Sequence, residues 1–208
     1  MRTRHVCLAL ILAALLGALA TGPRAEQPPL GLTEEAVKSA KTPEERQAIA
    51  DRSIERLKPS RFPELPRTVT EELERRGCTI PQAYVDRRPH NVISGRFRDR
   101  SHVDWAILCS RNRLSAILIF WAGSTHDVTT LGESPDEGWL QGIGDAKVEY
   151  SRVIATASEE AMQHNRRVYD APRYPPIVHE GIEDAFAEKG SKVHYWYEGR
   201  WHQLPGGD

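Results

Sequence analysis

Two uninterrupted apolar runs constrain the fold of this 208-residue chain more than any other feature. Residues 105–109 read WAILC and residues 116–121 read AILIFW, and the polar stretch between them has Asn112 near its centre. Each run has the length of a strand, and asparagine tolerates the positive φ of a tight turn, so the pattern predicts an antiparallel hairpin. Because both faces of each strand are apolar, the sheet is expected to be covered on both sides.

The N-terminus predicts a secretory signal peptide. Arg2 and Arg4 precede an uncharged, mostly Leu and Ala stretch that ends at Ala20. This stretch is shorter than the roughly 20 apolar residues of a membrane span, and the small residues Ala18 and Ala20 suit a cleavage site. We therefore expect residues 1–20 to be removed and the protein to be exported, periplasmic or secreted, with no transmembrane span. An uncleaved membrane anchor is the alternative.

Removal of this segment would leave Cys78 and Cys109 as the only cysteines. In an oxidising compartment such a pair predicts one disulfide, which would stabilise the fold by roughly 3–4 kcal/mol through loop closure. Two separate buried thiols are the alternative. A zinc site is disfavoured, because neither cysteine has a second Cys or His at the spacing that zinc ligands adopt.

Charge and composition exclude several classes of partner. The chain carries 28 Lys and Arg against 29 Asp and Glu, and 39% of its residues are hydrophobic. A nearly neutral chain of this kind has no strong field for nucleic acid or for an anionic membrane surface. We therefore expect a soluble protein that binds no nucleic acid.

The remaining chain divides into three parts. Residues 21–32 are rich in Pro and Gly and are expected to form a flexible leader. Residues 33–76 are expected to form a helical segment, in which the sequence TPEE at 42–45 has the capping residue, proline and glutamate that begin a helix. Residues 77–208 are expected to form a β-rich α+β domain.

Shorter elements are predicted along this domain and just before it. The patterns favour a helix over 68–76 that ends at Gly77, strands over 91–97, 128–131 and 147–155, a helix over 158–167, a helical turn over 181–188, and a C-terminal hairpin of 193–197 with 200–204. In this hairpin Trp196 faces Trp201. The expected fold class is α+β, with N-terminal helices packed on a mainly antiparallel β-sheet that is closed by an aromatic hairpin.

The central segment carries a resemblance. The stretches 77–82, 91–97 and 104–110 look like those of a group of uncharacterised secreted bacterial proteins. The pattern Gly95-x-Phe97 followed by Asp104-x-Ala106 also resembles the FG-GAP (VCBS) repeat. In that family an Asp-rich loop joins two strands of a propeller blade and binds calcium.

The residues of this loop differ from the family's calcium ligands. The positions of the first three loop carboxylates hold Arg96, Arg98 and Arg100, while Asp104 is kept. Calcium needs about six to eight oxygen ligands, several of them anionic, and three guanidinium groups would repel it. We therefore expect no metal here and no cofactor elsewhere. We expect the arginines to replace the ion by pairing with Asp104 and with loop carbonyls.

Four aromatic residues near the C-terminus, Tyr195, Trp196, Tyr197 and Trp201, are candidate binding residues. If exposed, such rings stack on sugars or contact the side chains of a partner. The same spacing is typical of core-facing and cross-strand residues in a terminal hairpin, and it favours this interpretation. The function expected overall is a non-enzymatic secreted or periplasmic module that binds a protein, an envelope component or a glycan.

A periplasmic hydrolase is the alternative. Its site would use His179, Glu180 and Asp184, or the pair His126 and Asp127. The first group lacks the second histidine of the helical zinc-protease motif, and neighbouring residues on one extended segment cannot face one another. Convergence of these side chains in a deep cleft would favour the hydrolase, whereas exposed tryptophans on an open surface would favour binding.

Overall fold

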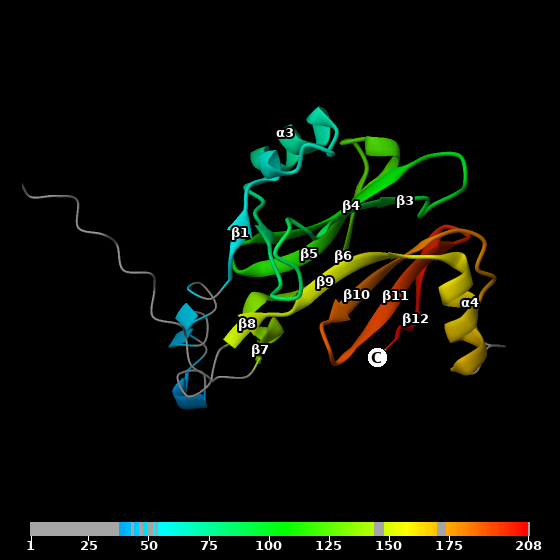
Figure 1. Cartoon of the computed structure of the whole chain (residues 1–208). Coiled ribbons are helices and arrows are strands. Elements are labelled where there is room, and N and C mark those ends of the chain that lie inside the picture. Colours follow the sequence, from blue (N-terminus) through cyan, green and yellow to red (C-terminus); the bar gives the residue numbers. More distant parts are fainter. Residues whose placement is uncertain are drawn as a thin grey trace, which may run out of the picture. The chain divides into compact units, whose positions relative to one another are not determined.

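The computed structural model describes residues 38–42, 44–45, 48–49, 52, 54–143, 148–169 and 174–207. The predicted signal peptide at 1–20 and leader at 21–32 lie outside these residues. The described part is mostly β, and its strands form four antiparallel sheets (Figure 1). Two of the sheets have four strands each, and two are short pairs.

The first large sheet has the order β3-β4-β5-β6, and the second has the order β12-β11-β10-β9. The first contains β3 (Val92–Gly95), β4 (Asp104–Arg111), β5 (Leu114–Phe120) and β6 (Val128–Pro135). The second contains β9 (Arg152–Ala157), β10 (Gly181–Phe186), β11 (Gly190–Tyr197) and β12 (Arg200–Pro205). The short pairs are β1 (Arg56–Leu57) with β2 (Ile80–Pro81), and β7 (Leu140–Gly142) with β8 (Val148–Tyr150). Single 3-10 turns lie at η1 (Pro59–Arg61), η2 (Trp121–Gly123) and η3 (Asp136–Trp139).

The two large sheets pack face to face and share one apolar core. Leu108 and Ile119 enter this core from the first sheet, and Ile154 and Ile182 enter it from the second. Alternate residues of β4 and β5, such as Ile107, point away from it into a second cluster on the outer face. The prediction that the central hairpin is covered on both sides is confirmed.

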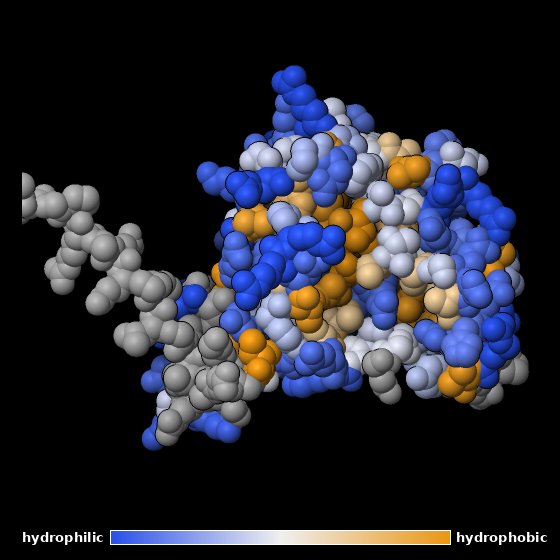
Figure 2. Space-filling view, in the orientation of Figure 1, coloured by the Kyte–Doolittle hydropathy of each residue, from blue (hydrophilic) through white to orange (hydrophobic). Residues whose placement is uncertain are grey.

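Helices cover the two outer faces. Helix α3 (Arg67–Arg75) buries Val69 and Leu73 against the outer face of the first sheet. Helix α4 (Glu159–Val168) buries Met162 against the second sheet. The layers therefore follow the order helix, sheet, sheet, helix, and Figure 2 shows hydrophilic side chains on the surface formed by α4.

The helices have the predicted ends. Gly77 follows α3 with a φ of 71°, and the N–H of Cys78 donates to the carbonyl of Leu73, so the helix closes with a left-handed glycine. At the start of α4, the Ser158 hydroxyl accepts a hydrogen bond from the N–H of Ala161 at 3.1 Å. This is the capping interaction typical of serine.

Both predicted hairpins are confirmed. In the central one Leu108 pairs with Ile117, and Asn112 has a φ of 53° in the turn. In the C-terminal one Trp196 pairs with Trp201, and the turn residue Gly199 has a φ of 81°.

A buried asparagine holds the two sheets together at β3 and β9. Asn91, which is 1% exposed, donates from Nδ2 to the carbonyls of Pro81 and Arg152 and accepts the N–H of Ile154 at Oδ1. Its φ of 69° turns the chain into β3. Because the side chain of Asn91 substitutes for backbone pairing between two strands, it connects the sheets without a continuous ladder.

The predicted α+β fold with N-terminal helices packed on one sheet is wrong. The start signal at 42–45 is formed, since the N–H of Glu45 donates to the Thr42 hydroxyl and the N–H of Thr42 donates to the Glu45 carboxylate. However, Arg56 and Leu57, which lie within the segment that was expected to be helical, form strand β1. Residues 33–76 are therefore not a continuous helical segment, and the fold is mostly β, with its packed helices at α3 and α4.

The predicted helical turn at 181–188 is also wrong, because residues 181–186 form β10, a central strand of the second sheet. Along this strand Ile182 and Asp184 both point inward and are at most 2% exposed. Because an aspartate occupies one of the inward-facing positions, the sequence lacks the alternation of apolar and polar residues that would have indicated a strand.

Candidate functional site

The loop between β3 and β4 is organised by one buried carboxylate. Asp104 is 2% exposed, and its Oδ2 accepts the N–H groups of Phe97 and Arg98, each at 3.1 Å. Its Oδ1 accepts the N–H of Ala122 at 2.8 Å, which ties the loop to η2. Burial raises the pKa of Asp104, while these three amide donors act in the opposite direction. Asp104 thus closes the loop with backbone amides, and the expected pairing of arginine side chains with Asp104 is wrong.

The three loop arginines make different contacts. The backbone N–H of Arg96 donates to the Glu180 carboxylate at 2.7 Å. The Arg98 guanidinium lies 5.4 Å from the centroid of the Trp121 ring. Arg100 donates to both carboxylate oxygens of Glu159 at 2.7–2.8 Å. These contacts join the loop to α4, to η2 and to the segment before β10.

Arg100 also reaches a backbone carbonyl outside its own loop. Its Nε donates to the carbonyl of Val178 at 2.9 Å. The guanidinium therefore crosslinks the loop to the segment 174–180 rather than to carbonyls of the loop itself. Because arginine holds several donors in a fixed plane, one side chain satisfies both partners.

Calcium is expected to leave the melting temperature of the protein unchanged, because the Asp104 carboxylate is buried and already accepts hydrogen bonds from three backbone amides. The measurement is a thermal melt in calcium and in excess chelator. A calcium-dependent rise of several degrees would show that the loop holds an ion after all.

The four candidate aromatic residues face opposite sides of the second sheet. Tyr195 is 1% exposed, lies in the cluster under α4, and donates its hydroxyl to the Pro175 carbonyl. Trp196 and Trp201 pack against the core between the sheets, where their rings lie 5.4 and 5.7 Å from the ring of Trp121. Tyr195 is therefore a core residue, and Trp196, Tyr197 and Trp201 are half-buried residues that pack against the edges of the two clusters.

One open depression lies where these aromatics meet the arginine loop. It has a volume of about 730 Å³. Its lining consists of Arg98, Asp99, Arg100, Val178, His179, Trp196, Tyr197, Glu198 and Gly199. We call it the loop-end depression. A smaller hollow of about 450 Å³ beside it shares Arg100 and His179 and extends to Arg96 and Glu180.

The rim of this depression combines an aromatic surface with charged groups of both signs. Val178 is 46% exposed and the rings of Trp196 and Tyr197 are half-buried, so apolar surface is available to a ligand. Burial and a hydrogen bond to Glu198 raise the pKa of Tyr197. The site therefore offers stacking surface together with hydrogen-bond donors and acceptors, without a strong net charge.

The candidate hydrolase residues do not form one group. His179 is 5% exposed and bonds through Nδ1 to the carbonyl of Glu180, and both residues line the smaller hollow. Asp184 instead forms a buried ion pair with Arg152. His126 is exposed on the loop after η2, and its N–H bonds to the Ser124 hydroxyl; Asp127 is exposed beside it.

The Arg152–Asp184 pair is the feature that sequence reasoning missed. Arg152 is fully buried, donates through Nε and Nη2 to Asp184 at 2.8 and 3.0 Å, and lies 4.5 Å from the Trp139 ring centroid. Its other donors bond to the carbonyls of Ser115 and Gly132. Every part of the guanidinium thus has a partner, and the group links both large sheets.

Stability is expected to fall as the pH drops from about 4 to about 2. Burial alone would raise the pKa of Asp184, but His194, Arg152 and Lys192 lower it from 3.8 to about 2. Since this value lies below that of an unfolded aspartate, ionised Asp184 stabilises the fold above pH 4, by roughly 2 kcal/mol, and this is lost on acidification. Chemical denaturation between about pH 2 and pH 4 measures the free energy of unfolding. This free energy should depend less steeply on pH in Asp184→Asn than in the wild type, and equal pH dependence in both proteins would contradict the assignment.

The disulfide prediction agrees with the structure. Cys78 and Cys109 lie at disulfide distance, with their Cα atoms 5.4 Å apart. Next to them Thr79 and Ser110 exchange backbone hydrogen bonds in both directions. Together these contacts fix the end of α3 to β4.

Within the described residues, no group of three or more His, Cys, Asp and Glu side chains is arranged to hold a metal ion. The helices of that part of the chain are also too short or too polar to cross a bilayer. Comparison of the chain with protein-family models, curated proteins and solved structures found no match.

Proposed function

We propose that the chain is an exported, non-enzymatic module that binds a glycan of the cell envelope at the loop-end depression. The observation that carries this proposal is the meeting of half-buried Trp196 and Tyr197 with Arg98, Asp99 and Glu198 around one open hollow. Sugar rings stack their C–H faces on aromatic side chains. Their hydroxyl groups both donate and accept, so planar charged groups of both signs suit them.

The charge of the rim favours a glycan over a strongly ionic partner. Arg98 and Arg100 are offset by Asp99 and Glu198, and Arg100 is already bonded to Glu159. These carboxylates would repel a highly acidic ligand, and the guanidinium groups would repel a highly basic one. A neutral ligand rich in hydroxyl groups is repelled by neither.

The depression is also preorganised. Asp104 fixes the backbone of the arginine loop, and Arg100 ties it to α4 and to Val178. A loop that is already ordered costs little conformational entropy when a ligand binds. This favours binding over a role in which the loop would have to rearrange.

Export is the second part of the proposal. The N-terminal pattern and the Cys78–Cys109 pair both suit an oxidising compartment outside the cytosol. N-terminal sequencing of the protein from the periplasm or medium should begin at Thr21. Protein that still begins at Met1 and remains in the cytosol would contradict export.

Binding is tested with a panel of envelope-derived and plant glycans, followed by calorimetry of any hit. Tyr197→Ala should weaken the affinity about tenfold or more, because it removes a stacking surface worth roughly 1.4 kcal/mol. Tyr169→Ala is the matched control: Tyr169 is 38% exposed at the end of α4 and does not line the depression. If no glycan binds, or if both variants lose affinity equally, the proposal fails.

A further inference from the structure

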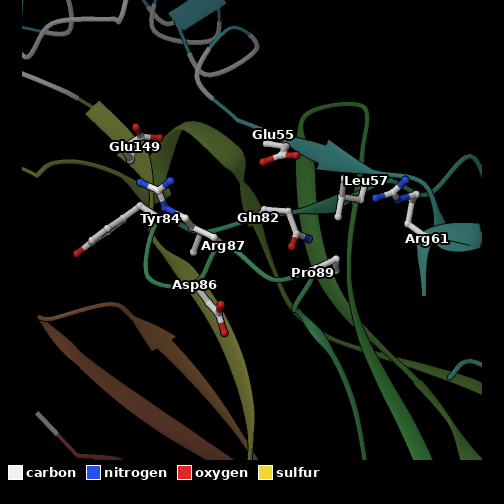
Figure 3. A pocket seen from close by; sticks show the side chains of 10 residues that line it. Glu55, Leu57, Arg61, Gln82, Tyr84, Asp86, Arg87, Pro89 and Glu149 are labelled. Carbon is white, nitrogen blue, oxygen red and sulfur yellow. The ribbon is translucent and has the colours of Figure 1, made fainter. Parts of the chain in front are cut away.

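Another hollow lies away from the loop-end depression and shares no lining residue with it. It has a volume of about 350 Å³, and Figure 3 shows the side chains around it. Its lining consists of Glu55, Leu57, Arg61, Gln82, Ala83, Tyr84, Asp86, Arg87, Pro89 and Glu149. A cavity of this size accommodates a small molecule. We call it the β1 pocket, because β1 forms part of its wall.

The wall of the β1 pocket is held by internal hydrogen bonds. The side chain of Gln82 donates to the carbonyl of His90 at 3.1 Å and accepts its N–H at 2.9 Å. The N–H of Ala83 donates to Nε2 of His90 at 2.8 Å, and the N–H of Gln82 donates to the carbonyl of Glu55. The segment 82–90 is therefore closed at its base and fixed to the residue before β1, so the pocket exists before any ligand arrives.

Two cations and two carboxylates around this pocket are left without partners. Among the described residues, no hydrogen bond or ion pair engages the side chain of Glu55, Arg61, Arg87 or Glu149. Other arginines nearby in the sequence are engaged: Arg56 pairs with Asp136, and Arg88 pairs with Asp86. Glu55, Arg61, Arg87 and Glu149 are therefore charged groups of the pocket lining that a ligand could engage.

These charges come from separate segments and surround an apolar strip. Figure 3 shows Arg61 on one side of the pocket beyond Leu57, Arg87 and Glu149 on the other side, and Glu55 between them. Leu57, Ala83 and Pro89 supply the apolar part of the lining. A ligand that carries both a positive and a negative group, with a short aliphatic portion, would match both charge types and the strip at once.

From this arrangement we propose that the β1 pocket binds a zwitterionic α-amino acid with an aliphatic side chain. Its carboxylate pairs with a guanidinium group of Arg87 or Arg61, and its ammonium pairs with Glu55 or Glu149. Leu57 and Pro89 contact the side chain. This site is independent of the glycan site and needs none of the residues of the loop-end depression.

The test is titration of the full chain with L-leucine, followed by calorimetry and amide chemical shifts. L-leucinamide, which lacks the carboxylate, and N-acetyl-L-leucine, which lacks the ammonium, should each bind at least tenfold more weakly. Leucyl-glycine and glycyl-leucine separate a free amino acid from a peptide end: tighter binding of either dipeptide than of L-leucine would overturn the proposal for the free amino acid.

Paired variants assign the binding to this pocket. Arg87→Ala and Glu55→Gln should each weaken L-leucine binding about tenfold. Arg75→Ala on α3, which removes an exposed arginine that pairs with Glu72 and lies outside the pocket lining, should change it less than twofold. Because Arg61, Arg87 and Glu55 are exposed, these variants should keep the wild-type melting temperature. Absence of saturable binding, or equal binding of the two blocked analogues, would overturn the proposal.

Discussion

Arg152→Leu is expected to destabilise the protein by about 3–5 kcal/mol, a large part of the stability of a single domain. The substitution leaves the Asp184 carboxylate buried between the sheets without its bidentate partner. It also removes the donors to the Ser115 and Gly132 carbonyls. Chemical denaturation monitored by tryptophan fluorescence measures the change.

Two further variants separate the ion pair from simple packing. Arg152→Leu combined with Asp184→Leu removes both charges and should recover much of the loss, because the unpaired carboxylate is gone. Lys192→Ala is the control: its ammonium lies 3.7 Å from Asp184 but is 42% exposed, so its removal should cost less than about 1 kcal/mol. If the double variant is as unstable as Arg152→Leu alone, the loss is due to packing.

Loss of the disulfide is expected to cost about 3–4 kcal/mol. The bond joins residues 31 positions apart, and reduction restores the conformational freedom of that loop in the unfolded chain. Cys78→Ala with Cys109→Ala should therefore melt well below the oxidised wild type. Reduced wild type should match the double variant.

Mass spectrometry under non-reducing conditions supplies the direct check of this bond. The protein purified without reductant should contain no alkylatable thiol at Cys78 or Cys109. Two free thiols, together with an unchanged melting temperature in the double variant, would contradict the assignment.

The elements that were predicted correctly depend on short-range signals. The central hairpin follows from two apolar runs and Asn112, and α3 and α4 follow from Gly77 and Ser158 at their ends. Each of these signals lies within a few residues of the structure it determines. Such signals are visible in one sequence without knowledge of tertiary contacts.

The errors arise where a distant partner decides the local structure. Asp184 looks like a surface residue of a helical turn until Arg152, 32 positions away, is brought beside it. Likewise β1 forms because Arg56 and Leu57 pair with β2, more than 20 residues later. Tertiary pairing overrides local propensity at both places.

The candidate site was predicted only in part. The arginine loop, His179, Glu180, Trp196 and Tyr197 were each identified from the sequence, but their convergence around one hollow was not. The role of Asp104 was also mistaken, because its hydrogen-bond partners are backbone amides. Every residue type except proline has a backbone N–H, so the sequence does not identify these partners. The four unpaired charges of the β1 pocket gave no signal at all, because exposed Glu and Arg are common everywhere on a protein surface.

The most direct test of the glycan-binding account is to map a bound oligosaccharide by amide chemical shifts. The account predicts that the shifts that change cluster at residues 98–100, 178–179 and 196–199, and that Tyr197→Ala abolishes them while Tyr169→Ala does not. Shifts that cluster elsewhere on the surface, or that survive in Tyr197→Ala, would contradict it.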